Sequence, residues 1–324
     1  MTEHNIISVS GGKDSTALLL LAIEQEAPSL QAVFADTGNE HPLTYEYLDY
    51  LERASGVHIQ RIRADFTAQI EKRRQMMQKV IEGTHKNQGR YEWTPTIARR
   101  ALEVLIPSGN PFLDMCLVHG RFPSTMVAFC SKELKRDQLT KQVHQPLLAL
   151  GEDVISWQGV RADESPKRAL LPMREHVLTH KTGGELWNYR PILTWTAEQC
   201  FEMHRKHGIE PNPLYSMGMA RVGCMPCINA RKDELLEISK RFPAELGRIA
   251  EWERLVSLAS KCSVATFFPA SDLGAASAAE ASTVTHGIQA RVEWAKTSRG
   301  GTQYDLLRSE SPAELCSSVY GLCE

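Results

Sequence analysis

Short apolar runs alternate with amphipathic stretches over the first part of the chain. Each run is flanked by turn residues and is rich in Ile, Val or Phe, which is typical of buried strands. The runs are residues 5–7, 31–35, 57–62 and 154–160. Between them, the spacing of apolar positions predicts helices, most clearly over 43–55 and 66–83. This alternation predicts an α/β fold with a doubly wound, mainly parallel sheet.

The C-terminal part of the chain has a different pattern. Residues 232–240 and 243–261 are charged and amphipathic, as expected for helices. Residues 270–281 consist largely of Ala and Ser, which favours a flexible loop. We therefore predict a sheet domain over residues 1–230 and a mainly helical region, with a cysteine-bearing tail, over residues 231–324.

The first predicted strand runs into a loop whose residues suit a polyphosphate. Two adjacent glycines let the backbone bring successive N–H groups close to a ligand, and the following helix adds the positive end of its dipole. A lysine adds a mobile cation, and serines add hydroxyl donors. The spacing does not fit the GxxxxGK[ST] loop of P-loop kinases, because the glycines are adjacent. The candidate binding residues are Ser8, Ser10, Gly11, Gly12, Lys13, Asp14 and Ser15.

Two further loops carry polar residues directly after a predicted strand. Asp36 and Thr37 follow the second strand, Gly159 lies near the end of the fourth, and Arg161 and Glu164 follow the fourth. In an open α/β sheet, ligands bind at the carboxyl ends of the strands, where such loops meet. The planar guanidinium of Arg161 suits a sulfate or phosphate, and Glu164 would orient that arginine or bind Mg²⁺. The sequence therefore predicts one ligand site built from three loops.

The chain contains eight cysteines. In a reducing cytosol this number favours metal or redox chemistry over a disulfide framework. Cys224 and Cys227 form a CxxC motif, which by itself fits a zinc site, a redox pair or two ligands of an iron–sulfur cluster. Cys200, Cys116 and Cys262 have no ligand-like neighbours, so we expect them to be buried thiols.

A helix is predicted over residues 197–207, and Thr196 is placed to cap its N-terminus. His204 and His207 lie about one turn apart on this helix, a spacing that would suit a metal pair. Because no carboxylate completes a site nearby in the sequence, we expect both histidines to be exposed helix residues.

The formal net charge is −2, so affinity for a polyanion would have to come from a local patch. Residues 72–100 are basic, with interleaved Tyr91 and Trp93, and this pattern fits either nucleic acid or a solvated helix face. No apolar run reaches the roughly 18 residues that a membrane span needs, and the N-terminus lacks a basic and then apolar leader. We therefore expect a cytoplasmic protein without membrane contact.

Several of these motifs occur together in one family. Residues 10–15 resemble the PP-loop of the adenine nucleotide α-hydrolase superfamily. Residues 36–38, 159–165 and 190–192 are similar to passages of its phosphoadenylyl-sulfate (PAPS) reductase branch. The resemblance covers residues 5–227 and implies a Rossmann-like, adenine nucleotide α-hydrolase-like fold. It also implies an adenine nucleotide ligand: either ATP with Mg²⁺, cleaved to AMP and pyrophosphate, or adenylyl sulfate or PAPS.

The same resemblance assigns roles to the loop residues. It places Asp36 and Thr37 near the adenosine or its phosphates. Lys13 and the loop amides would stabilise the charge that develops on the phosphates during transfer. The residues implied in catalysis are Lys13, Asp14, Arg161 and Glu164.

Cys130 stands in a Cys-Ser-x-x-Leu-Lys element that is similar to one in this family. Together with the CxxC motif it resembles the cysteine arrangement of iron–sulfur adenylyl-sulfate reductases and of DNA-phosphorothioation sulfurtransferases. That arrangement implies a [4Fe-4S] cluster, which needs a fourth thiolate from the C-terminal tail. We assign Cys323 to this position, with Cys316 as the other candidate, and structural zinc as the alternative to the cluster.

The Glu-Cys-Gly-Leu-His motif of thioredoxin-dependent reductases, whose cysteine attacks the sulfate sulfur, does not occur in the sequence. We therefore predict ATP-driven, iron–sulfur-dependent sulfur transfer, with DNA, tRNA or a small molecule as the acceptor. The alternatives are a PAPS or adenylyl-sulfate reductase that releases sulfite, and a non-enzymatic nucleotide-binding module with structural zinc. A sulfur donor or reductant protein, and a second copy of the chain as a homodimer, are further candidate partners.

Overall fold

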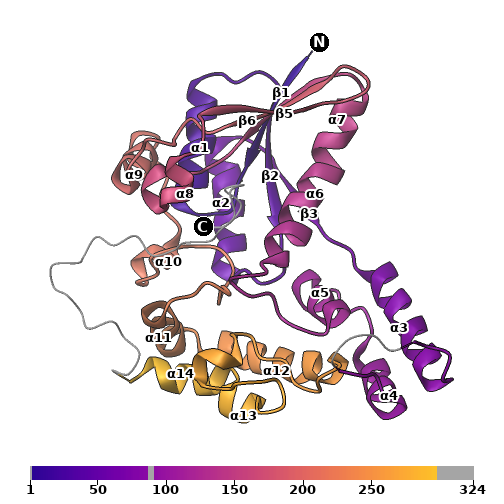
Figure 1. The fold of residues 1–324 in the computed structure, drawn as a ribbon. Coiled ribbons are helices and arrows are strands. Elements are labelled where there is room, and N and C mark those ends of the chain that lie inside the picture. Colours follow the sequence, from indigo (N-terminus) through magenta and orange to yellow (C-terminus); the bar gives the residue numbers. More distant parts are fainter. Residues whose placement is uncertain (1, 87–90, 298–324) are drawn as a thin grey trace.

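The computed structural model describes residues 2–86 and 91–297. These residues form a six-stranded sheet with the strand order β3-β2-β1-β4-β6-β5 (Figure 1). Neighbouring strands are parallel, except that β5 and β6 form an antiparallel hairpin at one edge. The strands are β1 (Glu3–Ser8), β2 (Leu30–Asp36), β3 (Ile59–Arg63), β4 (Asp153–Trp157), β5 (Arg174–Thr179) and β6 (Glu185–Tyr189). The predicted α/β class, with a doubly wound and mainly parallel sheet, is confirmed.

The central strand β1 is buried on both faces of the sheet. Ile7 packs on one face with Leu18, and Ile6 packs on the other face with Val143, because successive residues of a strand point to opposite sides. Such strands read as continuous apolar runs, since neither face meets water. The helices that cover the first face are α1 (Lys13–Glu24), α2 (Pro42–Ser55) and α9 (Ala197–Lys206).

One long helical stretch covers the opposite face (Figure 1). It begins directly after Cys130 and contains two π-helical segments, which often mark functional positions. Lys135 lies in the first of these segments and reaches the carboxyl edge of the sheet near Ser8. The segments of this stretch are η1 (Ser131–Arg136), α6 (Asp137–Leu139), η2 (Thr140–His144) and α7 (Gln145–Ala149).

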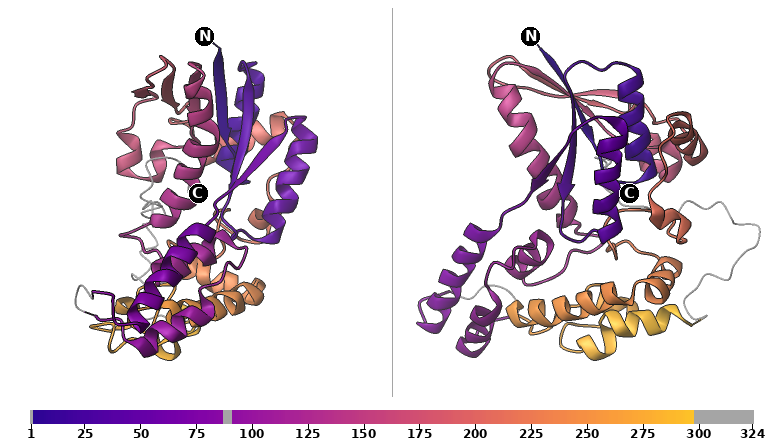
Figure 2. Two further views of the ribbon diagram at one scale, coloured as in Figure 1. Left: turned by 90° about the vertical axis from the view of Figure 1, so that its right-hand side faces the viewer. Right: turned by 180° about the vertical axis from the view of Figure 1, so that it is seen from behind.

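A second group of helices lies beyond the carboxyl edge of the sheet (Figures 1 and 2). Its members are α3 (Thr67–Ile81), α4 (Pro95–Val104), α5 (Pro111–His119), α11 (Lys232–Arg241), α12 (Pro243–Ala259), α13 (Thr283–His286) and α14 (Ile288–Ala295). All of them except α13 contribute to one hydrophobic core, in which Phe112 of α5 stacks on Trp252 of α12 with 5.5 Å between ring centroids. This core contains residues from both sides of position 230. The domain boundary at that position stays a prediction.

Short helical turns connect these parts: η3 (Ala162–Glu164), α8 (Pro166–Ala169), α10 (Pro213–Ser216) and η4 (Ala270–Leu273). The helices predicted over 43–55, 66–83 and 243–261 are confirmed, with slightly different ends. The β5–β6 hairpin was not predicted. Because nearly every side chain of β5 is exposed, its sequence carries neither an apolar run nor an alternation of apolar and polar positions.

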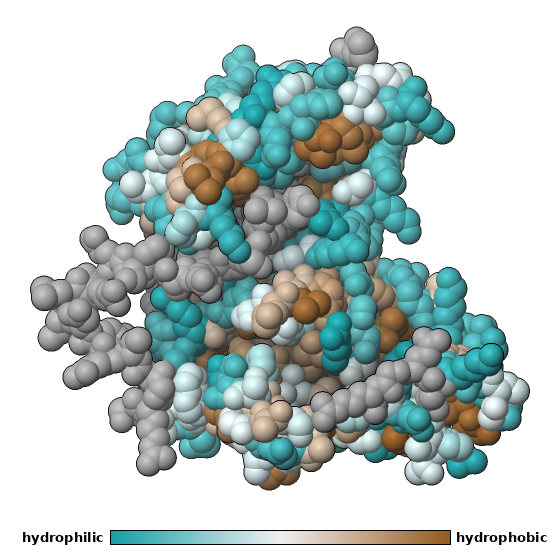
Figure 3. All heavy atoms as spheres, viewed as in Figure 1, coloured by the Kyte–Doolittle hydropathy of each residue, from teal (hydrophilic) through white to brown (hydrophobic). Residues whose placement is uncertain are grey.

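The face of the molecule in Figure 3 is mostly polar, with hydrophobic side chains in separate patches. The most exposed large apolar side chains belong to Met126, Leu170, Val284 and Leu150. Single exposed apolar residues of this kind are normal on protein surfaces. Within residues 2–86 and 91–297, no helix is both long enough and apolar enough to cross a bilayer.

Candidate functional site

The loop between β1 and α1 has the backbone geometry that the adjacent glycines predict. Gly11 has a φ of +82°, and a Cβ atom there would come within 3.0 Å of the Thr44 side chain. Gly12 is the N-cap residue of α1. The Ser15 hydroxyl closes the loop, since it accepts a hydrogen bond from the Ser10 amide at 3.0 Å and lies 3.0 Å from the Ser10 hydroxyl. We call residues 8–15 the phosphate loop.

Residues far along the chain hold Lys13 in place. Its amide donates a hydrogen bond to the Tyr215 hydroxyl at 2.8 Å, and its carbonyl oxygen lies 2.9 Å from Nε2 of His204. The Asn212 side chain donates to the Gly11 carbonyl at 3.2 Å. The expectation that His204 is exposed was wrong: its side chain is fully buried against the loop. Sequence spacing gave no signal for this contact, because α9 reaches the loop only through the tertiary fold.

Asp14 and Arg161 form a buried ion pair between the phosphate loop and the loop after β4. Asp14 is fully buried, and its Oδ1 lies 2.9 Å from Nε of Arg161, while its Oδ2 lies 2.9 Å from Nζ of Lys13. Burial alone would lower the pKa of Arg161, but the carboxylates of Asp14, Asp163 and Glu164 outweigh it, and the pKa is raised. The arginine therefore keeps its charge inside the site.

The loop after β4 packs directly on the phosphate loop. A Cβ atom on Gly159 would lie 3.5 Å from the Ser15 amide, so glycine permits this close approach. Glu164 accepts hydrogen bonds from the Arg161 amide, at 3.2 Å, and from the Arg168 guanidinium. Glu164 thus binds the main chain of Arg161 and the side chain of Arg168. Its predicted roles, to orient the Arg161 guanidinium or to bind Mg²⁺, stay predictions.

The loop after β2 is fixed by its own polar side chains. Asp36 accepts hydrogen bonds from the Gly38 amide and from the Tyr45 hydroxyl, both at 2.8 Å. The buried Thr37 hydroxyl donates to Glu40 at 2.6 Å. Asp36 and Thr37 thus lie at the predicted edge of the sheet, and their contact with an adenosine stays a prediction.

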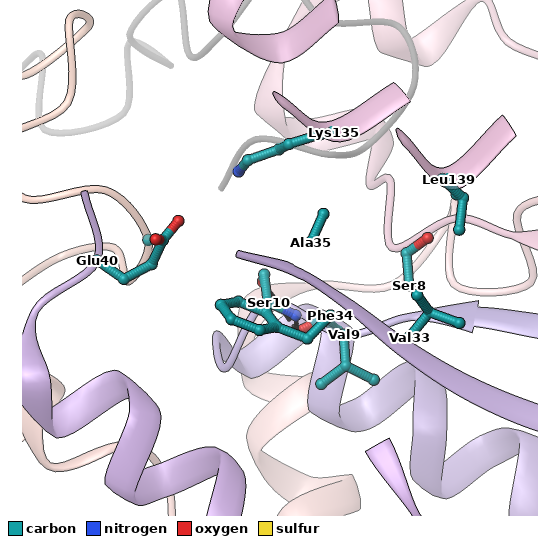
Figure 4. A pocket seen from close by; sticks show the side chains of 11 residues that line it. Ser8, Val9, Ser10, Val33, Phe34, Ala35, Glu40, Lys135 and Leu139 are labelled. Atoms are coloured by element: carbon teal, nitrogen blue, oxygen red, sulfur yellow. Dashed lines mark hydrogen bonds between the residues drawn. The ribbon is translucent and has the colours of Figure 1, made fainter. Parts of the chain in front are cut away.

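A cavity of about 30 Å³ opens at the phosphate loop, lined by Ser8, Ser10 and Ser15. Lys135 and Glu40 project toward one another from opposite sides of it (Figure 4). Neither residue was predicted as part of the site. The sequence signal available for Lys135 was its place as the final lysine of the Cys-Ser-x-x-Leu-Lys element that begins at Cys130. The inward direction of Glu40 follows from the turn after β2.

Three of the predicted metal ligands line a second, adjacent cavity of about 20 Å³: Cys130, Cys224 and Cys227. Thr37 and Lys135 also line it, so Lys135 borders both cavities. The fold brings Cys130 together with the CxxC motif, although they are far apart in sequence.

Hydrogen bonds join the CxxC loop to the loop after β2. The Met225 amide donates to the Asn39 carbonyl at 2.8 Å, and the Asn39 side chain donates to the Pro226 carbonyl at 3.0 Å. Sγ of Cys224 lies 3.5 Å from the Thr37 hydroxyl and 3.7 Å from a Glu40 oxygen. Burial and the Glu40 carboxylate raise the pKa of Cys224 to about 12, so without a metal it is a thiol.

The cysteine cavity has the donor chemistry of a metal centre but only part of a ligand set. Thiolates are the usual ligands of zinc and of iron–sulfur clusters. In the described part of the chain, no three His, Cys, Asp or Glu side chains are arranged to ligate an ion. The fourth predicted ligand, Cys323, and the other candidate, Cys316, lie outside the described residues. Cys116 and Cys200 are buried as expected, and Cys262 is half-buried.

The basic stretch over residues 72–100 uses several of its arginines to hold helices together. Arg73 lies over the Trp93 ring at 5.0 Å, and Arg74 donates to the carbonyls of Leu102 and Leu105. Lys72, Lys79 and Arg99 are exposed. Contact with a nucleic acid stays a prediction, for which these three cations and Lys86, which is also exposed, are available.

The fold and the site together define an α/β protein with a glycine-containing phosphate loop at the strand-order reversal of a parallel sheet. Comparison with protein families matches residues 4–230 to the phosphoadenosine phosphosulfate reductase domain. The chain therefore belongs to this family, which indicates an enzyme of sulfur-nucleotide metabolism.

Three curated relatives show the range of similarity. An uncharacterized 37.8 kDa protein of Escherichia phage 186 is 50% identical over 99% of this chain and 96% of that protein. The nin region protein ORF290 of Escherichia phage lambda is 28% identical over 61% of each chain. Phosphoadenosine 5'-phosphosulfate reductase of Buchnera aphidicola is 24% identical over 75% of this chain and 78% of that enzyme.

Among solved structures, PAPS reductase from Candida auris, in a phosphate complex, aligns with 70% of this chain and 83% of its own. The sequence identity is 15% and the TM-score is 0.37.

Proposed function

We propose that this protein binds an adenine nucleotide at the phosphate loop and uses it in sulfur chemistry at the adjacent cysteine cavity. The observation that carries this proposal is the position of Lys135, which lines both cavities. A cation at their common border can contact a phosphate or sulfate in one cavity while facing the thiols of the other. Two unrelated sites would have no need of a shared charged residue.

The favoured nucleotide is ATP with Mg²⁺. Ser10, Ser15 and the amides at the start of α1 would bind the β- and γ-phosphates, and Lys13 would neutralise charge on them. A sulfur or oxygen nucleophile on the acceptor would attack the α-phosphorus. The bond from that phosphorus to the bridging oxygen would break, and pyrophosphate would leave, with AMP on the acceptor. The Asp14–Arg161 pair would hold the two loops in register.

The cysteine cavity would hold the second centre. Cys130, Cys224 and Cys227, with Cys323 or Cys316 from the tail, would bind a [4Fe-4S] cluster. With all four irons held by thiolates, such a cluster would supply electron-transfer chemistry beside the nucleotide. Displacement of AMP from the activated acceptor by a sulfur nucleophile would complete the transfer. The acceptor is DNA, tRNA or a small molecule, and a sulfur donor protein would supply the sulfur, with a reductant protein as the other candidate partner.

A second candidate function is reduction of PAPS or adenylyl sulfate. The relative from Buchnera aphidicola carries this activity in its name, and Arg161 and Lys135 would suit a sulfate as well as a phosphate. In this reaction, the thiolate of Cys323 or Cys316 would attack the sulfur, the bond from the sulfur to the phosphate oxygen would break, and the nucleotide would leave without its sulfate group. A dithiol reductant would then cleave the bond between the two sulfur atoms and release sulfite. The missing Glu-Cys-Gly-Leu-His motif is the reason that we rank it second.

Product analysis distinguishes the two reactions. Protein that has been purified and reconstituted without oxygen is incubated with ATP and Mg²⁺, and separately with adenylyl sulfate or PAPS and a dithiol reductant. Pyrophosphate release from ATP supports the proposal, whereas sulfite without pyrophosphate supports the reductase. A colourless protein with stoichiometric zinc and neither product would support the non-enzymatic module instead.

A further inference from the structure

A tyrosine hydroxyl occupies the entrance of the phosphate loop. Lys13 is the first residue of α1, so its N–H is one of the donors that have no partner within the helix. Such donors form an anion site at a helix N-terminus. Here the Tyr215 hydroxyl accepts the Lys13 N–H at 2.8 Å. Gly12, the N-cap residue, offers no side chain for this role, and Tyr215 supplies the acceptor instead.

The ring of Tyr215 is held from two directions. It makes an edge-to-face contact with Phe201 of α9, with 5.5 Å between centroids. Its short helix α10 is capped at the N-terminus by Asn212, whose side chain accepts the Leu214 amide at 3.0 Å and donates to the Gly11 carbonyl at 3.2 Å. Leu214 is fully buried. The turn that carries Tyr215 is therefore tied to the loop, which places its hydroxyl at the Lys13 amide.

We propose that Tyr215 sets the affinity of the phosphate loop, because its hydroxyl holds the position of a ligand oxygen and must be displaced when a polyphosphate binds. This inference rests on the proposed function, in which the loop binds the phosphates of an adenine nucleotide. One N–H makes one well-aligned hydrogen bond, so the hydroxyl and a phosphate oxygen compete for it. A charged oxygen forms the stronger bond, and a polyphosphate also contacts several other donors of the loop.

Replacement of the hydroxyl tests the competition directly. Tyr215→Phe keeps the ring and its contact with Phe201 but removes the acceptor. Isothermal titration with inorganic pyrophosphate, and with ATP and Mg²⁺, should show binding roughly 2- to 10-fold tighter than that of the wild type, the worth of one ordinary hydrogen bond. In the absence of ligand, the variant should melt at a lower temperature. A residue with a merely structural role would weaken binding and stability together.

Tyr50→Phe is the matched control. The Tyr50 hydroxyl accepts the amide of Glu210 at 2.9 Å, so it also binds a main-chain N–H of the segment that leads to α10, but away from the loop. Its loss should leave the affinity for pyrophosphate unchanged.

Two results would overturn the inference, and they have different meanings. If the wild type binds pyrophosphate or ATP and Tyr215→Phe binds them equally or more weakly, Tyr215 does not compete with the ligand, and the proposed function stands. If the wild type binds neither probe, the phosphate loop is not a nucleotide site, and both proposals fail. A tyrosine ultraviolet difference spectrum on ligand binding, present in the wild type and absent in Tyr215→Phe, supports displacement of the hydroxyl independently of the variant's affinity.

Discussion

Oδ1 of Asp14 and Nε of Arg161 lie 2.9 Å apart inside the protein, one at the start of α1 and the other after β4. Asp14 is fully buried, and Arg161 is 6% exposed. Because the two loops meet where the strand order reverses, this pair fixes the geometry of the phosphate loop relative to the rest of the carboxyl edge. The contact links a residue of the loop motif to one that sequence analysis chose as an anion ligand.

Neutralising one partner of this pair should destabilise the fold. Asp14→Asn keeps the size of the side chain but leaves the Arg161 charge without its fully buried carboxylate partner. We expect the free energy of unfolding to fall by about 3 kcal/mol, as for other broken buried ion pairs. Urea unfolding followed by circular dichroism measures this change.

Asp163→Asn is the control for that measurement. Asp163 also lies 2.9 Å from the Arg161 guanidinium, but half of its side chain is exposed, so its loss should cost less than about 1 kcal/mol. Equal losses for the two variants would mean that burial does not decide the strength of this interaction.

The cysteines that line the cysteine cavity are the ones that we expect to bind metal. Anaerobically purified wild-type protein should contain iron and inorganic sulfide and absorb visible light, and Cys130→Ser or Cys227→Ser should lose most of both. Cys262→Ser should keep them, because Cys262 is half-buried and does not line the cavity. Iron analysis, sulfide analysis and absorption spectra provide the test. Stoichiometric zinc in place of iron would contradict the cluster, and retention of metal by Cys227→Ser would contradict the ligand assignment.

Glu253 should make stability depend on pH. Its carboxylate is 2% exposed and accepts the amides of Phe267 and Ile288, which joins α12 to the start of α14. Burial raises the pKa of Glu253 to about 7, and the two amide bonds only partly oppose this shift. A pKa above that of the unfolded chain means that the native state holds the proton more tightly. The stabilising contribution is complete below about pH 4.5 and is lost as pH rises through about 7.

Comparison with Glu253→Gln isolates this effect. As pH rises from the pKa of Glu253 in the unfolded chain, 4.5, to its pKa in the native state, about 7, the wild type should lose roughly 3 kcal/mol of stability relative to the variant. Each pKa unit corresponds to about 1.4 kcal/mol. Urea unfolding of both proteins from pH 5 to pH 8 tests this expectation. Parallel curves for the two proteins would show that Glu253 titrates normally.

The sequence was sufficient for the central strands and for the phosphate loop. β1, β2 and β4 are buried on both faces, so their apolar runs were visible without knowledge of their partners. The phosphate loop could be predicted from its own residues, because Gly11 needs a positive φ and a helix begins directly after the two glycines. Gly159, which packs on the Ser15 amide, was singled out because residues 159–165 resemble a passage of the family.

The remaining parts of the site depend on contacts that local patterns do not encode. His204 and Tyr215 reach Lys13 from α9 and α10, and a helical spacing does not say which element a side chain will meet. Lys135 was not predicted as a site residue, because its place between the two cavities follows from the path of the long helical stretch. The exposed strand β5 lacked the apolar signal that identifies a strand.

Titration with nucleotide is the most direct test of the central claim, that the phosphate loop binds an adenine nucleotide. We predict that the wild type binds ATP with Mg²⁺ and that Lys13→Ala binds it roughly 10- to 100-fold more weakly, since a charge-assisted contact is lost. Lys167→Ala, which removes an exposed cation on α8, should bind as the wild type does. Failure of the wild type to bind any adenine nucleotide, or undiminished binding by Lys13→Ala, would contradict the account.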